Sequence, residues 1–293
     1  MNSDTAARFA PALFVLLWST GFIGAKWGLP YADPATFLFV RFLVVSLLLA
    51  AVVAWLRVPL PRRGADLIHL SISGILVHGV YLGGVFGAIS AGVNAGVAAL
   101  IVGTQPLLTA VMVGPSLGER VSPRQWLGFL AGVVGVYLVV QGKLSLESQQ
   151  ATGLLLCVAA LVGISIGTVY QKRFCSAMDL RAGSMVQFVA AGVFVGLFAL
   201  VFEDREIEWN AQFWFALSWL CVVLSLGAIS LLMWLIRRGA ASHIASLFYL
   251  VPPLVALEAW LLFGETLDRA ALAGMAFCAV GVYLVLHSRR AAR

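Results

Sequence analysis

The sequence predicts an all-α integral membrane protein, with ten transmembrane helices as two inverted five-helix repeats around a central cavity. Three observations predict this fold: the composition, a series of apolar runs of spanning length, and an internal duplication. Of the 293 residues, 61% are hydrophobic and 11% are charged. A soluble domain is about 45–50% apolar and about 25% charged. A water-soluble globule of this length could not bury so much apolar surface, so lipid is the expected solvent.

The apolar residues fall into runs that match the thickness of a bilayer. A transmembrane helix needs about 20 mostly apolar residues, and charged or Pro/Gly-rich breaks separate ten such runs. The stretch 66–116 lacks a clear break, so we divide it at 90–96, where Ser, Gly and Asn cluster. The expected helices cover residues 9–29, 34–56, 66–88, 93–116, 123–141, 151–171, 180–201, 211–236, 242–263 and 268–288.

The distribution of basic residues predicts the orientation. With the N-terminus inside, 14 Lys and Arg residues lie in cytoplasmic segments and 4 lie in outer segments, while Arg41 falls within the second run. This bias favours cytoplasmic N- and C-termini. It also explains the net charge of +6 without a nucleic-acid partner. The first run follows a short N-terminus and is long enough to span, so we expect an uncleaved signal anchor.

The two halves of the chain repeat one another. A shift of 146 residues places 134–139 on the identical 280–285, and 94–139 contains 14 identities without a gap. The halves are therefore 1–146 and 147–293. Five helices per half is an odd number, so the second half must enter the membrane from the opposite side. Inverted repeats of this kind hold a solute site between them near the midplane and open it to each side in turn.

Both the start of the chain and the ends of the halves resemble a known family. The start reads Trp18-Ser19-Thr20-Gly21-Phe22, then Lys26, Asp33-Pro34 and Arg41, and each half ends in Gly-Glu and Gly-Val-Tyr-Leu. This pattern resembles the EamA-type proteins of the drug/metabolite transporter (DMT) superfamily, along essentially the whole chain. The resemblance implies a ten-helix exporter of metabolites or xenobiotics in a bacterial inner membrane. It is closest to the bacterial exporters of aromatic amino acids and paraquat.

Other function classes lack their motifs. The sequence contains no Gly-x-x-x-x-Gly-Lys-Ser/Thr, no His-Glu-x-x-His and no Gly-x-Ser-x-Gly, and its four cysteines have no metal-ligand spacing. We therefore expect no enzyme activity, cofactor, metal or nucleic acid. The expected partners are a small-molecule substrate and the lipid bilayer, with a monomer as the simplest assembly. The leading hypothesis is a secondary exporter of amino acids, including aromatic ones, or related metabolites and drugs, working by alternating access. The alternative is a channel-like facilitator for a small solute or ion.

Ionisable residues inside spans are costly and are candidates for function. Arg41 suits a carboxylate through its planar fork, and its counterpart in the second half is Gln187. Glu258 could carry a coupling proton. It could equally be an ion-pair partner of Arg41 or Lys26, so we leave coupling and ion pairing open. His78 is a candidate substrate contact or proton-linked switch, and the alternative is a neutral histidine bonded to a neighbouring helix.

Aromatic and polar residues at mid-span are the remaining candidates for a cavity wall. Tyr81 lies three residues after His78, so both share one helix face, and Trp18 lies at a similar depth. Prolines at matching places in the two halves predict kinked helices beside the solute path. The alternative readings are core packing, an interfacial aromatic belt, and kinks without solute contact. The predicted cavity residues are Trp18, His78, Tyr81, Thr104, Gln105, Ser246 and Tyr249, and the predicted kinks lie at Pro106, Pro252 and Pro253.

Overall fold

The computed structural model describes residues 3–109, 112, 122–141, 148–228, 231, 250–266 and 268–288, and these residues are predominantly helical. The first half contains α1 (Ser3–Gly28), η1 (Leu29–Tyr31), α2 (Pro34–Trp55), α3 (Gly64–Gly74), η2 (Ile75–Val80), α4 (Tyr81–Ser90), α5 (Ala95–Gly103) and α7 (Pro123–Gln141). The second half contains α8 (Ser148–Phe174), α9 (Leu180–Phe202), α10 (Ala211–Ser218), η3 (Trp219–Ala228), α13 (Val251–Phe263) and α14 (Arg269–Ser288).

Several of these helices are long and apolar enough to cross a bilayer. Six meet this criterion by length and composition: Phe9–Tyr31, Pro34–Trp55, Gly64–Ser90, Gln149–Phe174, Leu180–Phe202 and Ala211–Ala228. Shorter apolar helices cover Ala95–Thr109, Val251–Phe263 and Arg269–Leu284. The chain is therefore a multi-pass, all-helical membrane protein. The count of ten, the inverted repeat and the side of each terminus stay predictions.

Large apolar side chains cover the outer surface of the bundle. Trp55 is 82% exposed, Val201 71% and Leu155 70%. Patches of this kind are rare on water-soluble monomers. Lipid tails offer these side chains the apolar surroundings that water does not, so the exposed pattern supports a bilayer as the solvent.

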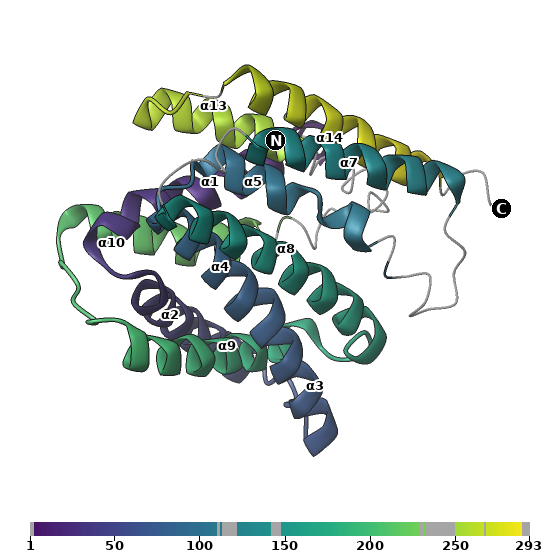
Figure 1. The fold of residues 1–293 in the computed structure, drawn as a ribbon. Helices are drawn as coiled ribbons and strands as arrows, with labels where there is room; N and C mark the ends of the chain where they lie inside the picture. The colour runs from purple at the N-terminus through teal and green to yellow at the C-terminus, as the bar shows by residue number, and fades with distance from the viewer. Residues whose placement is uncertain are drawn as a thin grey trace.

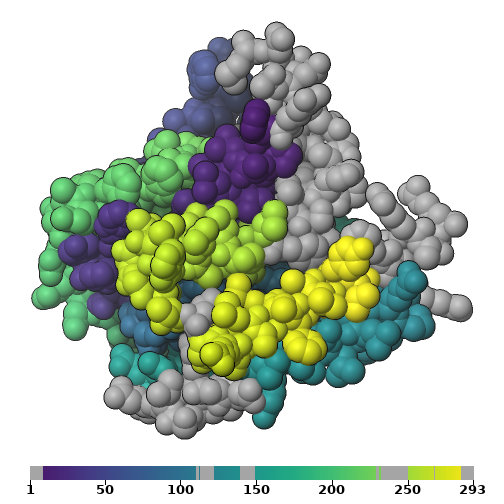
Figure 2. Space-filling view, turned by 90° about the horizontal axis from the view of Figure 1, so that it is seen from above, coloured from purple at the N-terminus to yellow at the C-terminus, as the bar shows by residue number. Residues whose placement is uncertain are grey.

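The helices pack in pairs at two ends of the molecule. Helices α2 and α9 lie side by side at one end, and α7 and α14 lie side by side at the other (Figure 1). Figure 2 shows α14, in yellow, running along the teal residues of α7. Between these two pairs, α1 contacts α13 and α4 contacts α8. Each of these pairs joins one helix from the first half to one from the second.

Glycines allow α7 and α14 to touch backbone to backbone. A Cβ on Gly135 would lie 2.7 Å from the carbonyl oxygen of Gly274, and a Cβ on Gly281 would lie 2.5 Å from that of Gly128. Contacts this close are possible only without side chains. The two contacts are reciprocal in the repeat register, because a shift of 146 residues carries 135 to 281 and 128 to 274.

The third span differs from the regular α-helix expected over 66–88. It runs from Gly64 to Ser90, but its middle, η2, is a π-helix. A second π-helix, η3, occupies the equivalent span of the second half, where the repeat register places 75–80 on 221–226. A π turn adds a residue without changing the hydropathy pattern, so the sequence pattern could not reveal it. Such segments often occur at functional sites.

The break between the third and fourth spans lies where the composition predicted it. Helix α4 ends at Ser90 and α5 begins at Ala95. Gly92 between them has φ of +86°, a left-handed conformation that favours glycine. Helix α5 is interrupted at Thr104, two residues before Pro106, and continues to residue 109. Pro252 and Pro253 lie in the first turn of α13, where a missing N–H costs no bond. The residues before Leu250 lie outside the described residues, so a kink there stays a prediction.

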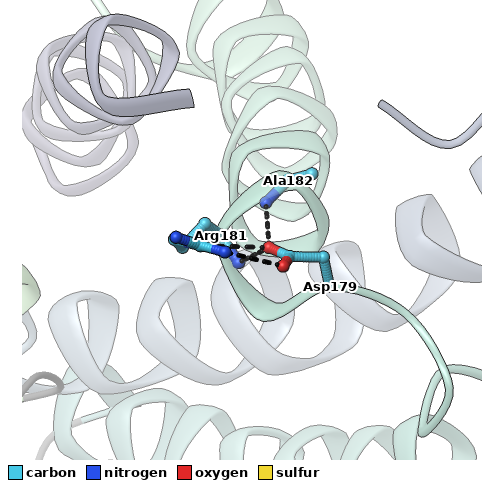
Figure 3. A network of polar contacts seen from close by, with 3 residues as sticks. All are labelled: Asp179, Arg181 and Ala182. Carbon is cyan, nitrogen blue, oxygen red and sulfur yellow. Dashed lines mark hydrogen bonds and ion pairs between the residues drawn. The ribbon is translucent and has the colours of Figure 1, made fainter. Parts of the chain in front are cut away.

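Carboxylates cap the first turns of two packed helices. Asp179 accepts hydrogen bonds from Arg181 N at 2.8 Å and Ala182 N at 3.3 Å at the start of α9 (Figure 3). The Arg181 side chain also donates to Asp179, with Nη2 and Oδ2 3.0 Å apart. This hydrogen bond, ahead of the backbone contacts, lowers the pKa of Asp179. The start of α9 is thereby satisfied by its own N-cap residue.

Helix α2 is capped differently, by a residue far along the chain. Asp33 at its N-cap position makes no side-chain capping bond. Instead, the Glu203 carboxylate accepts from Ala35 N at 2.8 Å, Thr36 N at 2.7 Å and Thr36 Oγ1 at 2.8 Å. Next to this contact, Glu208 N donates to Tyr31 O at 2.9 Å. The end of α9 is thus tied to the start of α2.

Candidate functional site

A cavity with an empty volume of about 720 Å³ lies between the two halves. Helices α1, α2 and α4 and the segment η2 form its first-half wall, and α8, α9 and η3 form its second-half wall. This volume includes space open to solvent, and about 130 Å³ of it is accessible to the centre of a water-sized sphere. The residues that distinguish its wall chemically are Trp18, Phe22, Arg41, His78, Tyr81, Phe86, Phe188 and Ser225.

Three of the seven predicted cavity residues line this space. Trp18 comes from α1, His78 from the π segment η2 and Tyr81 from the first turn of α4. The His78 ring is stacked on Phe188 of α9, with centroids 4.2 Å apart and an interplanar angle of 17°. Phe42 of α2 packs behind both rings, 5.6 Å from Phe188 and 6.2 Å from His78. The stack gives the cavity a flat apolar surface that spans both halves.

Arg41 places a buried guanidinium at the cavity wall. The residue is only 3% exposed. Its Nη2 donates to Ser225 Oγ at 3.2 Å, and the Ser225 hydroxyl donates in turn to Leu220 O at 3.0 Å. The Arg41 Nε–H is buried without a hydrogen-bond partner. A guanidinium offers five donors, so its hydrogen-bonding capacity is incompletely used.

Glu258 has other partners than Arg41. Its Oε1 lies 2.7 Å from Ser19 Oγ, and its Oε2 is buried without a partner. Ser19 Oγ is also 2.8 Å from Leu16 O, yet a hydroxyl has one proton to donate. The Ser19 hydroxyl is therefore shared between the Glu258 carboxylate and the Leu16 carbonyl, and it donates to one of them at a time. Among the described residues, no ion pair joins Glu258 to Arg41, so the structure separates these two candidates.

The remaining predicted cavity and kink residues that the structure describes do not line the 720 Å³ cavity. Thr104 is buried, and its hydroxyl donates to Ile101 O at 2.6 Å. Gln105 Nε2 donates to Thr168 Oγ1 at 3.0 Å, which ties the fourth span to α8. Pro252 and Pro253 border a separate apolar pocket of about 600 Å³ beside α14. Ser246 and Tyr249 lie outside the described residues.

Sequence reasoning missed the second-half wall and one ion pair. Phe188 and Ser225 were not singled out, because a phenylalanine and a serine are common throughout the spans. The Lys26 ammonium bonds the carboxylate of Glu265. Glu265 also accepts from Ala95 N at 3.1 Å, so it links α1 to α5. The repeat was the available signal, because it duplicates Lys26 as Lys172 and Glu265 as Glu119.

Comparison with known proteins identifies the family. The model of the EamA-like transporter family matches residues 8–141 and again 151–287. The chain is 27% identical to the uncharacterized transporter YvbV of Bacillus subtilis (strain 168), over 94% of this chain and 89% of the relative. It is 26% identical to the uncharacterized inner membrane transporter YedA of Escherichia coli (strain K12), with the same coverage.

Two further similarities extend over nearly the whole length. A probable amino-acid metabolite efflux pump of Salmonella typhimurium is 24% identical, over 97% of this chain and 96% of the relative. A solved crystal structure superimposes with a TM-score of 0.64 at 21% identity, covering 98% of this chain and all of the other. That likeness concerns the fold alone. Together with the apolar spans and the cavity between the halves, the two family matches show that this chain belongs to the EamA-like transporter family of the DMT superfamily.

Proposed function

We propose that this transporter exports amino acids, including aromatic ones, or related small metabolites and drugs by alternating access. It works as a secondary transporter in a bacterial inner membrane, with the bilayer and a small solute as its partners. The observation that carries the proposal is the place of the cavity relative to the repeat. Its wall includes both members of two repeat-related pairs, Trp18 with Ile164 and His78 with Leu224. A site shared in this way lies where two inverted repeats would meet.

Three features support the inverted arrangement behind this mechanism. The family model matches each half separately. The contacts of Gly135 and Gly281 are reciprocal, as expected for a two-fold related pair. The π segments η2 and η3 occur at equivalent positions and both reach the cavity. Two similar halves around one site give two conformations of related energy, each open to one side.

The aromatic wall supports an aromatic or bulky apolar solute. Trp18, Phe188 and the ring of His78 provide flat surfaces, and ring contacts contribute about 0.5–1.5 kcal/mol beyond area burial. The relative in Salmonella typhimurium that is named as a probable amino-acid metabolite efflux pump points to the same class of solute.

Counterflow in proteoliposomes tests the proposal. Purified protein is reconstituted and loaded with unlabelled phenylalanine, tryptophan or leucine, and uptake of the labelled amino acid is followed with and without a proton gradient. We expect saturable counterflow that protein-free liposomes lack. Flux that neither saturates nor exchanges would indicate a channel-like facilitator instead. No flux of any amino acid or metabolite tested, with folded protein, would contradict the proposal.

A pair of tryptophan substitutions links the flux to the cavity. Leu82→Trp inserts an indole at a lining position, and Leu155→Trp makes the same change where the side chain is 70% exposed on the outer surface. We expect counterflow to be lost with Leu82→Trp and kept with Leu155→Trp, at equal amounts of folded protein. Equal flux in both variants would mean that the solute takes another path.

A further inference from the structure

The geometry around Arg41 points to an organic carboxylate as the solute, bound with its carboxylate on this guanidinium and its apolar body against the aromatic wall. This inference rests on the proposed function and narrows its substrate class from small metabolites in general to carboxylic acids. It also excludes simple organic cations as preferred solutes.

Among the described residues, the Arg41 guanidinium has no acidic partner. An arginine is effectively always protonated in proteins, and removing its charge from water without a partner costs several kcal/mol. Arg41 is 3% exposed and has a neutral serine as its hydrogen-bond partner, while its Nε–H is left without one. A carboxylate bound side-on would engage the Nε–H and an Nη–H together.

No Asp or Glu of the chain is placed to pair with Arg41 among the residues that the structure describes. Among the described residues that line the cavity, none is Asp or Glu. Glu258 bonds Ser19 instead, and the stretch 229–249, of which the structure describes only Leu231, contains no acidic residue in its sequence. Of the acidic residues elsewhere, all fall in the expected loops or at their edges. The negative charge that Arg41 lacks is therefore one that a ligand can bring.

The positive charge of Arg41 disfavours cationic solutes in the cavity. Arg41 is the fixed charge among the described lining residues, so the cavity has a positive potential. A solute ammonium would meet repulsion from the guanidinium and find no carboxylate to offset its own desolvation. A solute with a carboxylate and no ammonium fits best, and a zwitterionic amino acid fits less well because its ammonium finds no acidic partner.

The two halves of the chain differ at the position of Arg41. The repeat register places Arg41 on Gln187, and Gln187 Nε2 donates to Ser73 Oγ at 3.2 Å, as Arg41 donates to Ser225. Helix packing at this position is thus compatible with a neutral glutamine bonded to a serine. The charge of Arg41 goes beyond what the fold needs, and Arg41→Gln is a substitution that the second half has already accommodated.

Three probes with one carbon skeleton test the inference. Phenylalanine carries a carboxylate and an ammonium, 3-phenylpropionate carries only the carboxylate, and phenethylamine carries only the ammonium. Equilibrium binding of each labelled probe to the purified full-length protein is measured for wild type, Arg41→Gln, Arg41→Lys and the exposed control Arg62→Gln. Melting temperature in detergent checks that each variant is folded.

We expect 3-phenylpropionate to bind most tightly, phenylalanine less tightly and phenethylamine weakest. Arg41→Gln should weaken 3-phenylpropionate by about tenfold or more, the range of a charge-assisted hydrogen bond, and should not weaken phenethylamine. Arg41→Lys keeps the charge but loses the planar fork, so it should recover part of the affinity. Arg62→Gln should match wild type.

Several results would overturn the inference. If phenethylamine binds as tightly as 3-phenylpropionate, the cavity does not select solutes by charge. If folded Arg41→Gln binds 3-phenylpropionate with unchanged affinity, Arg41 does not bind the carboxylate. If Arg41→Gln does not fold, the order of the affinities of the three probes for the wild type tests the inference by itself. Amino-acid counterflow that persists while the probe order is reversed would leave the proposed transport intact and sink the carboxylate site alone.

Discussion

The contact of Glu203 with the start of α2 predicts a large effect from a single surface carboxylate. Glu203→Ala removes the acceptor of two backbone N–H groups and of the Thr36 hydroxyl. Loss of an N-cap costs about 0.5–2 kcal/mol, and loss of a negative charge at a helix N-terminus about 0.3–1 kcal/mol. Glu203 is half-buried, so water replaces part of what is lost. We expect a decrease of about 2 kcal/mol in the free energy of unfolding.

Equilibrium unfolding by SDS in mixed micelles measures this decrease. Glu203→Gln keeps one acceptor oxygen but loses the charge, so it should cost about half as much. The control is Glu206→Ala, which removes an exposed carboxylate three residues further along the same loop. If Glu203→Ala and Glu206→Ala unfold at the same SDS fraction, the carboxylate does not cap α2 and the reasoning is refuted.

Two further predictions concern the α7–α14 contact and the start of α9. Gly135→Ala puts a Cβ 2.6 Å from Cys278 Sγ and 2.7 Å from Gly274 O, so we expect a loss of about 1–3 kcal/mol in the same titration. Gly83→Ala meets nothing within 4 Å and should be neutral or stabilise the protein by up to about 1 kcal/mol; a similar loss in both would argue against the close contact. Asp179→Ala should cost about 1 kcal/mol at pH 7. Because the folded-state pKa of Asp179 is lowered, its stabilisation is present above its unfolded-state pKa, about 4, and is lost as the pH falls through the lower folded value. The wild type and Asp179→Ala should therefore converge in acid, and a constant difference from pH 7 to pH 3 would contradict this assignment.

The sequence was sufficient for the solvent and the class of the fold, because both depend on composition. The break between α4 and α5 was also predictable, since Gly92 and its neighbours mark a turn in any environment. The π segments were not. A helix with an additional residue per turn keeps the same apolar composition, so hydropathy does not distinguish it from a regular α-helix.

Side chains of unusual chemistry were predictable as candidates, whereas their partners were not. Trp18, His78 and Tyr81 stand out in an apolar helix, and the structure places all three on one cavity. Thr104 and Gln105 stood out in the same way, but their bonds are used within α5 and toward α8. Polarity within a span indicates that a partner is needed, and a sequence does not tell whether protein or solute supplies it.

Some positions related by the repeat carry the same residue in both halves, whereas others carry different residues. Packing contacts are duplicated, as with Gly135 and Gly281 at the α7–α14 contact. In the cavity wall, Gly21, Val77 and Phe188 are identical to their repeat partners, whereas the register places Trp18 on Ile164 and His78 on Leu224, all four of which line the space.

These differences give the cavity two unlike sides. Both halves supply aliphatic and phenyl groups, but the first half adds an indole, an imidazole, a phenol and the guanidinium of Arg41, whereas the second half adds the hydroxyl of Ser225. Two similar halves suit a protein that must have two conformations of nearly equal energy. A solute with one charged end is bound best by a site whose two ends differ in charge. The unlike residues Trp18, Arg41 and His78 in the first half agree with the proposed recognition of a solute with one charged end.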